Sequence, residues 1–354
     1  MSSGRLRKAL STRNRIAIDT EFVRERTFFS QLCLVQVATD DDIFCVDPLA
    51  ETDGDARAEF WELMMHSPWT LHSGRQDVEV IYQSADAMPE SVFDTQVAAA
   101  LLGYAPQMGY AGMVEELFDV RLAKTHTRAD WSKRPLGPEL LEYAAEDVIH
   151  LLPAHELLAE RLQQLGRLAW AEQDSADLLR PQLYDIYPEL AIAKVKGARN
   201  LKGVLHGIAA RLATWREREA VRNNRPRQWI MKDKLLLDIA VARPATREEL
   251  TALPGMSPRT AGRASPDILA AVKAAKSDDS DYKPPARPNE AQKSLLKVLQ
   301  KRVADSAEEL GIASEIVAPR KELSAAVNGD RNGRVFNGWR AELIGNDLLG
   351  LLDD

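Results

Sequence analysis

The alternation of apolar and polar residues predicts a small sheet in the first fifty residues. Short apolar runs at 15–23, 32–37 and 42–47 have the length and composition of β-strands, and Pro48 ends the third. The connections between these runs are short enough for neighbouring strands to run antiparallel. We therefore expect a three-stranded antiparallel meander at the start of the chain.

From residue 55 the pattern changes to an alternation of strands and helices. Two further apolar runs predict strands, and 137–165 predicts a long helix or a broken pair of helices, with Pro153 at the break. Strands followed by alternating β and α elements indicate an α/β domain with a mixed sheet and helices packed against it. The predicted strands are 69–72 and 91–93, and the predicted helices are 55–66, 76–84, 94–102 and 110–118.

After about residue 190 the strand signals end and the pattern is helical. Apolar residues between Leu201 and Trp215 follow the spacing of one helical face, and further helical stretches continue to residue 275. Residues 277–289 are charged and rich in proline, as in a linker, and the helical pattern then resumes. We expect an α/β domain followed by two all-α bundles, with boundaries at 1–190, 191–276, 277–289 and 290–354.

The composition is that of an ordinary globular protein. The chain has 354 residues, 45% hydrophobic and 28% charged, which excludes a wholly disordered chain. No apolar run approaches the roughly 20 residues that span a bilayer, and the basic N-terminus lacks the apolar core of a signal peptide. Cys33 and Cys45 lie in apolar runs and are expected to be buried free thiols of a reducing compartment. These features predict a cytoplasmic protein with no membrane association.

The formal net charge of −7 hides an uneven distribution. Residues 190–273 contain 17 Lys and Arg against 7 Asp and Glu, a local balance of +10. The rest of the chain therefore carries −17. A basic helical module is the electrostatic pattern expected where a protein contacts phosphate, so the net acidity does not exclude a nucleic-acid partner.

Two acids occupy the first predicted strand. Asp19 and Glu21 are two residues apart, so both side chains leave the same face, and Ile18 and Phe22 beside them are apolar. Two carboxylates this close repel each other unless a cation neutralises them, and Mg²⁺ or Mn²⁺ prefers such oxygen ligands. The alternative is a strand end with two solvated acids.

Three more acids have competing interpretations. Asp77 can be a ligand or an acid at a helix N-terminus, and Asp94 is interpreted as a helix N-cap. Tyr143 and Asp147 are four residues apart and share a helix face, an arrangement that a core tyrosine beside a solvated acid would also give.

Taken together, these segments resemble the ribonuclease D branch of the DEDDy family of 3′→5′ exonucleases. The resemblance covers about residues 15–165, although Ser73 stands where the wider superfamily often has asparagine. It rests on DTEF at 19–22, HSGRQDVEV around Asp77 and the Tyr143-xxx-Asp147 spacing, with SQLCLVQVA at 30–38, VDPL at 46–49, FDTQVAA at 93–99 and DWSKRPL at 130–136 in support.

The resemblance implies an RNase H-like sheet that carries a two-metal site. Asp19 would contact both Mg²⁺ or Mn²⁺ ions, Glu21 and Asp147 would complete the site that activates water, and Asp77 would support the second ion. The Tyr143 hydroxyl would orient the attacking water. Independently of the family, two divalent cations can stabilise both the attacking and the leaving oxygen of a phosphoryl displacement.

Basic residues outside the carboxylate cluster are candidates for RNA contact. In the segment 124–134, Arg128, Lys133 and Arg134 can contact the RNA backbone, or the segment is a solvated connector with Trp131 in the core. Residues 195–275 resemble the HRDC module of RecQ helicases and ribonuclease D, and 290–354 resembles a second, diverged copy. RNA-contacting candidates in the first module are Arg222, Arg225, Arg227 and Lys232; the alternative is a protein-contact module with solvated cations.

The sequence thus predicts a 3′→5′ exoribonuclease that releases nucleoside 5′-monophosphates. Its expected substrate is RNA with a free 3′ end, and the family implies 3′ trimming of tRNA precursors. A monomer is favoured. Two alternatives stay open: a general or DNA-directed 3′→5′ exonuclease, and a non-catalytic RNA-binding scaffold.

Overall fold

The structure, a computed structural model, describes residues 4–50, 53–122, 129–275 and 288–353. Contacts divide the chain into two units, which are described separately. The sheet unit comprises Met1–Val23, Gln31–Tyr184 and Ala286–Asp354, and the helical unit comprises Arg24–Ser30 and Asp185–Pro285. Arg128, one of the predicted RNA-contacting residues, lies outside the described residues.

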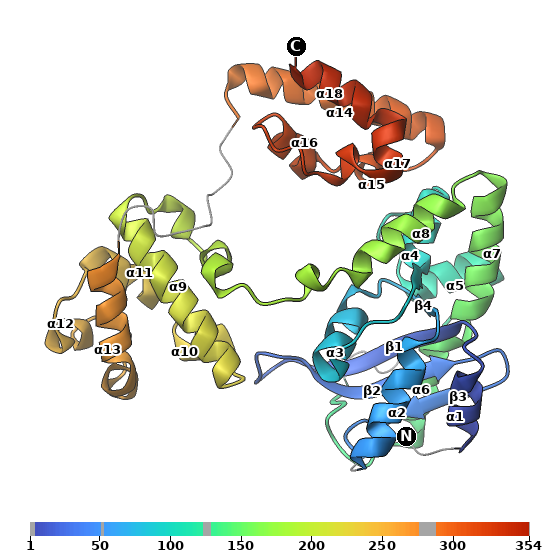
Figure 1. The fold of residues 1–354 in the computed structure, drawn as a ribbon, viewed down its shortest axis with the longest axis horizontal. Coiled ribbons are helices and arrows are strands. Elements are labelled where there is room, and N and C mark those ends of the chain that lie inside the picture. Colours follow the sequence, from blue (N-terminus) through green and yellow to red (C-terminus); the bar gives the residue numbers. More distant parts are fainter. Residues whose placement is uncertain (1–3, 51–52, 123–128, 276–287, 354) are drawn as a thin grey trace. The chain divides into compact units, whose positions relative to one another are not determined.

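The described strands form one mixed sheet in the order β3-β2-β1-β4-β5 (Figure 1). The first three strands pair antiparallel, whereas β4 and β5 run parallel to β1. The predicted meander and the mixed α/β sheet are therefore confirmed. The strands are β1 (Ile16–Val23), β2 (Gln31–Ala38), β3 (Ile43–Val46), β4 (Trp69–Leu71) and β5 (Val92–Asp94).

Helices cover both faces of this sheet. Successive residues of a strand point to opposite faces, so Ile16 and Ile18 pack into one core while Ala17 between them packs into another. The first core is closed by α1 (Gly4–Ser11), α2 (Gly54–Met65) and α3 (Arg75–Ala85). The second is closed by α4 (Thr95–Leu101), α5 (Tyr110–Phe118), α7 (Leu151–Gln164) and α8 (Leu168–Ala176).

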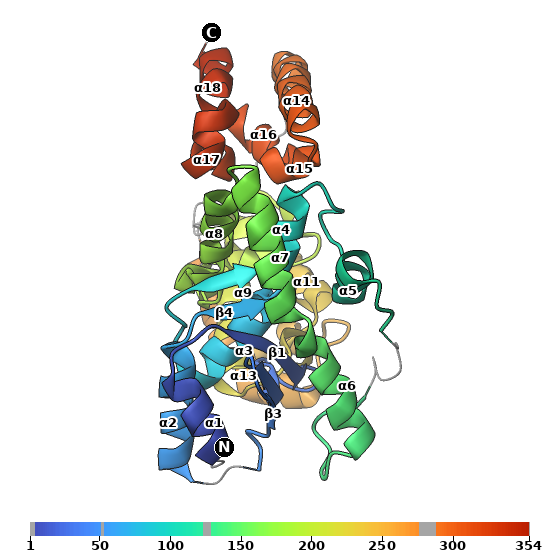
Figure 2. The same ribbon diagram turned by 90° about the vertical axis from the view of Figure 1, so that its right-hand side faces the viewer.

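The predicted long helix over 137–165 is a broken pair. A single residue, His150, lies between α6 (Pro138–Ile149) and α7 (Leu151–Gln164). Figure 2 shows the two helices following each other with a change of direction. A proline ring clashes with the carbonyl group four residues earlier, which for Pro153 is that of Ile149. The break therefore falls at His150, three residues before the proline.

The last helices of the chain share the second core of the sheet unit. Their buried side chains, such as Leu299, belong to the same cluster as residues of α4, α7 and α8. Trp339 stacks on Trp170 with ring centroids 4.3 Å apart, and buried Arg340 makes two 2.6 Å bonds to the Asp174 carboxylate. The predicted boundaries at 190, 276 and 289 remain a prediction. These helices are α14 (Glu290–Leu310), α15 (Ser314–Val317), α16 (Arg320–Ala326), α17 (Gly338–Arg340) and α18 (Asn346–Asp353), with a helical turn at Ala341–Gly345.

The helical unit has its own hydrophobic core. Apolar residues on one face of its longest helix, including Ile208 and Leu212, pack against residues such as Leu236 and Ile268 of the later helices. Its elements are the short helix Pro188–Lys194, α9 (Val204–Arg222), α10 (Arg227–Ile230), α11 (Asp233–Ala242), α12 (Arg247–Thr251) and α13 (Pro258–Ala274). This core makes the unit an independently packed bundle.

Two smaller expectations can be checked directly. Both cysteines are free thiols, Cys33 buried and Cys45 half-buried, in agreement with the sequence. Across the part of the chain that the structure describes, no helix combines the length and the apolar character that a membrane crossing requires.

Candidate active site

Strand β1 is the central strand of the sheet, and it places Asp19 and Glu21 on the same face. Asp19 lies opposite Gln36 of β2, and Glu21 lies opposite Leu34. A β-bulge follows Glu21, so the register shifts between Glu21 and Phe22. Bulges increase local twist and can redirect a side chain, and here the bulge comes directly after the second acid.

Helix α6 brings the third acid to the same face. It packs on β1, β2 and β3, with Ala144 and Val148 fully buried. One carboxylate oxygen from each of Asp19, Glu21 and Asp147 lies within 4.8 Å of the others. Three acids from elements more than 120 residues apart in sequence thus converge at one point.

Asp77 lies at the start of α3 and is buried, with 8% of its surface exposed. Its Oδ1 accepts a 2.5 Å hydrogen bond from the hydroxyl of Thr20, the residue between the two acids of β1. The loop before it is held by Asp94, whose carboxylate accepts the backbone N–H groups of Ser73 and Gly74 at 2.9 Å each. Asp94 also caps α4 through the Gln96 N–H, so its interpretation as an N-cap is confirmed.

The surroundings of the four acids disfavour their charged forms, mainly through burial. Burial, then the neighbouring carboxylates, raises the pKa of Asp19 well above its usual range and raises that of Glu21 to about 8. Burial raises the pKa of Asp147 to about 6, with a smaller contribution from Glu146. Burial also raises the pKa of Asp77 to about 6, against the lowering effect of the Thr20 hydrogen bond.

This donor set fits a hard divalent cation. The converging atoms are all carboxylate oxygens, the ligands that Mg²⁺ and Mn²⁺ prefer. No basic side chain among the described residues forms an ion pair with Asp19, Glu21, Asp77 or Asp147, and none lowers their pKa values. A bound cation would supply the missing positive charge, so the cluster can hold a metal ion.

Tyr143 lies one helical turn before Asp147 on α6 and is half-buried. Its ring stacks against that of Trp131 with centroids 6.4 Å apart, and Trp131 is buried, as its core interpretation predicted. Burial and the carboxylates of Asp147 and Glu21 raise the pKa of Tyr143 to about 12. The hydroxyl therefore keeps its proton at neutral pH and can donate a hydrogen bond.

The predicted RNA contacts beside this site are engaged in other interactions. Arg134 makes a two-pronged ion pair with Asp47, at 2.6 and 2.7 Å, and also donates to the carbonyl oxygens of Trp131 and Cys33. Its role in this structure is to fasten the segment before α6 to the sheet. Lys133 is exposed and lies 3.7 Å from Asp130.

The four cations predicted in the helical unit divide into two kinds. Arg222 pairs with Glu219, and Arg227 pairs with buried Glu217 while its guanidinium lies 4.4 Å from the ring centroid of Phe28. Arg225 and Lys232 are exposed, and neither side chain forms an ion pair with another described residue. Sequence position alone did not separate these two kinds of cation.

Two residues of the site were not singled out by the sequence. Thr20 carries the hydrogen bond to Asp77, and Gln36 lies buried opposite Asp19. Both are polar residues within strands that are otherwise largely apolar, and this signal marks them in the sequence.

Comparisons with known proteins cover both units. A family model described as a 3′-5′ exonuclease matches residues 4–163, and an HRDC domain model matches residues 206–272. Ribonuclease D of Gluconacetobacter diazotrophicus is 38% identical over 353 residues, covering 96% of this chain and 87% of that protein. Ribonuclease D of Acidiphilium cryptum is 37% identical, covering 95% and 87%.

A solved structure is similar over nearly the whole chain. It is the crystal structure of Escherichia coli RNase D, described as an exoribonuclease involved in structured RNA processing. The TM-score is 0.85 at 29% identity, with 99% of this chain and 96% of that chain covered. The similarity therefore includes the sheet unit and the helical unit.

Proposed function

We propose a mechanism from the premise that this chain belongs to the ribonuclease D family and is a 3′→5′ exoribonuclease. In this proposal it hydrolyses the 3′-terminal phosphodiester of RNA and releases nucleoside 5′-monophosphates one at a time. The observation that carries the proposal is the convergence of Asp19, Glu21 and Asp147 without a neutralising basic side chain among the described residues.

The four acids would hold two divalent cations, Mg²⁺ or Mn²⁺. Asp19 would serve both ions, Glu21 and Asp147 would complete the site beside the attacking water, and Asp77 would support the second. When bound, the two cations act as Lewis acids that stabilise negative charge on the attacking and leaving oxygens. The hydrogen bond from Thr20 fixes the Asp77 carboxylate in a single orientation.

Tyr143 would orient the attacking water through its hydroxyl. Its raised pKa keeps the phenol protonated, so it donates a hydrogen bond rather than acting as a base. Stacking on Trp131 limits the rotation of the ring and so fixes the direction of that bond. No histidine nucleophile is needed for this chemistry.

The physiological substrate in this proposal is RNA with a free 3′ end, with tRNA precursors as the expected class. The similar Escherichia coli protein is described as acting in structured RNA processing, which supports a structured RNA. The resemblance of residues 290–354 to a second HRDC module remains part of the proposal, since the HRDC model matches 206–272.

One experiment tests the catalytic proposal. A 3′-extended tRNA and a DNA strand of matched sequence are incubated with the full chain and Mg²⁺, Mn²⁺ or EDTA, and the products are followed over time. We expect stepwise RNA shortening that EDTA abolishes. Asp19→Asn should reduce turnover at least about 10³-fold, and Tyr143→Phe about tenfold with less effect on metal binding.

Asp41→Asn is the matched control, because Asp41 is an exposed acid of the sheet unit outside the cluster. Its turnover should equal that of the wild type. Full activity of Asp19→Asn would contradict the assignment of the site. Equal shortening of DNA would favour the general exonuclease, and RNA binding without cleavage would favour the scaffold.

A further inference from the structure

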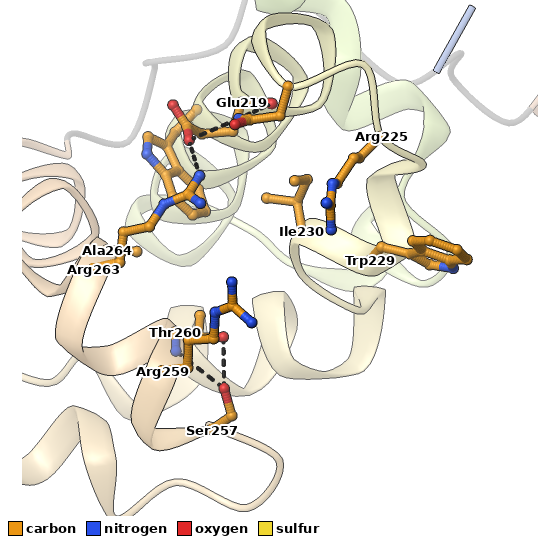
Figure 3. A pocket seen from close by; sticks show the side chains of 11 residues that line it. Glu219, Arg225, Trp229, Ile230, Ser257, Arg259, Thr260, Arg263 and Ala264 are labelled. Carbon is orange, nitrogen blue, oxygen red and sulfur yellow. Dashed lines mark hydrogen bonds and ion pairs between the residues drawn. The ribbon is translucent and has the colours of Figure 1, made fainter. Parts of the chain in front are cut away.

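The helical unit contains a pocket of about 360 Å³ between the end of α9, α10 and the start of α13. Figure 3 shows Arg225 and Arg259 reaching toward this space from opposite sides, with Trp229 at its edge. The pocket lies entirely within the basic segment 190–273, so its electrostatics can be read from that unit alone. Its charged and aromatic lining residues are Trp215, Glu219, Arg225, Trp229, Arg259 and Arg263.

The spare charge in this pocket is positive. Glu219, the one acid among its lining residues, is nearly buried and is neutralised by Arg222 at 2.6 Å and by Arg263 at 2.8 Å. Arg225 and Arg259 are exposed, and neither makes an ion pair with a described residue. Two guanidinium groups are thus available for an anionic ligand.

Trp229 supplies an aromatic surface beside these two arginines. With 59% of its surface exposed, it is the most exposed large hydrophobic side chain among the described residues. It lies within α10, a single turn of helix whose first residue, Arg227, is fixed by an ion pair with Glu217. A tryptophan on a short, anchored turn presents its ring at little further entropic cost.

We propose that this pocket binds single-stranded RNA, with one base stacked on Trp229 and the adjoining phosphates held by Arg225 and Arg259. The combination of an exposed aromatic ring and unpaired arginines suits an unpaired nucleotide, whose base can leave its neighbours to stack. A duplex keeps its bases stacked inside, so it can use the arginines but not the tryptophan. The inference rests on the proposed function and adds to it a second RNA-binding site, made of residues of the helical unit.

The test measures binding without cleavage. Full-length protein in EDTA is titrated into a fluorescently labelled 12-nucleotide single-stranded RNA, a blunt RNA duplex and a single-stranded DNA, and anisotropy gives each Kd. Trp229→Ala should weaken binding of the single strand about five- to 100-fold, and Trp229→Phe should keep most of the affinity. Binding of the duplex should change less than twofold.

Substitution of the arginines should also change how strongly binding depends on salt. Arg225→Gln and Arg259→Gln should each weaken binding of the single strand and lower the slope of log Kd against log salt by roughly 0.7. Arg218→Gln is the matched control, because Arg218 is an exposed arginine of α9 that does not line the pocket. It should leave that slope unchanged.

The possible outcomes separate this inference from the catalytic proposal. If Trp229→Ala and Arg259→Gln bind the single strand as the wild type does, the pocket is not an RNA site, whatever the nuclease activity. An equal loss of duplex binding in Trp229→Ala would contradict stacking and point to a folding defect. Wild-type protein that binds the strand here but never shortens it would contradict the catalytic proposal alone.

A second inference comes from Gln36, a fully buried residue of β2 directly opposite Asp19. Neither its Nε2 nor its Oε1 has a hydrogen-bond partner among the described residues. A buried amide without partners destabilises a protein, so its presence in a central strand calls for a compensating role. Directly opposite residues of antiparallel strands share a face with Cβ atoms roughly 5 Å apart, which brings the amide within reach of the Asp19 carboxylate.

We propose that Gln36 is a positioning residue whose amide N–H donates to the Asp19 carboxylate when the site holds a cation. This role rests on the proposed metal site. Gln36→Met keeps the length of the side chain and removes the unpaired polar atoms. Thr70→Val is the matched control. The Thr70 hydroxyl is also buried and has no hydrogen-bond partner among the described residues, but in the sheet Thr70 lies beside Ala17 rather than Asp19.

Two measurements distinguish this role from a purely structural one. Calorimetry gives the Mn²⁺ affinity, and thermal unfolding in EDTA gives the stability of the metal-free protein. Both variants should unfold at or above the wild-type temperature in EDTA, because each removes an unsatisfied buried group. Gln36→Met alone should weaken Mn²⁺ binding, by about fivefold or more. Unchanged Mn²⁺ affinity in Gln36→Met would refute the role, and a wild type that binds no Mn²⁺ would refute the proposed metal site together with it.

Discussion

The acids of the sheet unit and those of the helical unit lie in opposite electrostatic surroundings. In the sheet unit, burial and neighbouring acids raise the pKa values of Asp19 and Glu21. In the helical unit, Glu217 is also buried and Asp233 is half-buried, but hydrogen bonds and ion pairs from Arg227 and Arg216 lower their pKa values. The first arrangement costs stability and suits a cation, whereas the second is a completed set of ion pairs.

This difference shows that a formal charge count does not give the charge available to a ligand. The +10 balance of residues 190–273 includes arginines that internal acids already neutralise, among them Arg216, Arg222 and Arg227. Among the cations without such a partner, Arg225 and Arg259 line the same pocket. In the sheet unit the carboxylates have no such partners among the described residues, and burial and their proximity raise their pKa values.

The largest stability effect that follows from this comparison is expected at Asp233. Asp233→Ala would leave Arg216, of which 1% is exposed, without the carboxylate that it contacts at 2.6 Å. Removing one partner of a buried pair should cost about 3 kcal/mol of unfolding free energy. Urea unfolding of the full chain, followed by circular dichroism, measures the change.

Lys234→Ala is the control for this prediction. It removes the ion pair between Lys234 and Asp238, which lie on neighbouring turns of the same helix. The lysine side chain of this pair is 83% exposed. Such a surface pair should contribute no more than about 0.5 kcal/mol. Equal losses in the two variants would mean that burial does not distinguish the ion pairs of the helical unit.

Local patterns in the sequence predict much of this fold. Short apolar runs predict the strands, and the face shared by Asp19 and Glu21 follows from the two-residue period of a strand alone. Helix 110–118 is found with the predicted bounds, because its apolar spacing is regular and Asp119 ends it in a left-handed conformation. The N-cap role of Asp94 is equally local, since the cap and the helix that it starts are adjacent in sequence.

Long-range pairings account for what the sequence did not predict. The RNA contact of Arg134 remains a prediction, but its ion pair with Asp47 was not foreseen, because Asp47 lies 87 residues earlier and no local spacing links the two. The packing partners of the last helices were not predicted either: the Arg340–Asp174 pair and the Trp339–Trp170 stack join them to the sheet unit, while their domain boundary remains a prediction. Amphipathic spacing shows that a helix face is buried, not what buries it.

A smaller effect, on the pH dependence of stability, tests the same comparison in the metal-free protein. The pKa of Glu21 rises from an ordinary value near 4.5 in the unfolded chain to about 8 in the folded one. The folded state therefore binds more protons than the unfolded state between these values, and stability falls as pH rises through this window. For Asp147, with a folded pKa of about 6, the loss occurs between pH 4 and 6.

In EDTA the folded state should consequently be more stable at pH 5.5 than at pH 8, by a free energy on the order of 2 kcal/mol, and thermal unfolding should occur at a higher temperature at pH 5.5. Glu21→Gln should reduce this dependence, because it removes one of the groups whose pKa is raised. Glu217→Gln should not, because the lowered pKa of Glu217 places its titration below pH 4.5. Adding Mn²⁺ at pH 8 should restore the stability lost, since a cation replaces the protons. If the wild type is equally stable at both pH values in EDTA, the carboxylates are not held in mutual repulsion, and the contrast between the two units disappears.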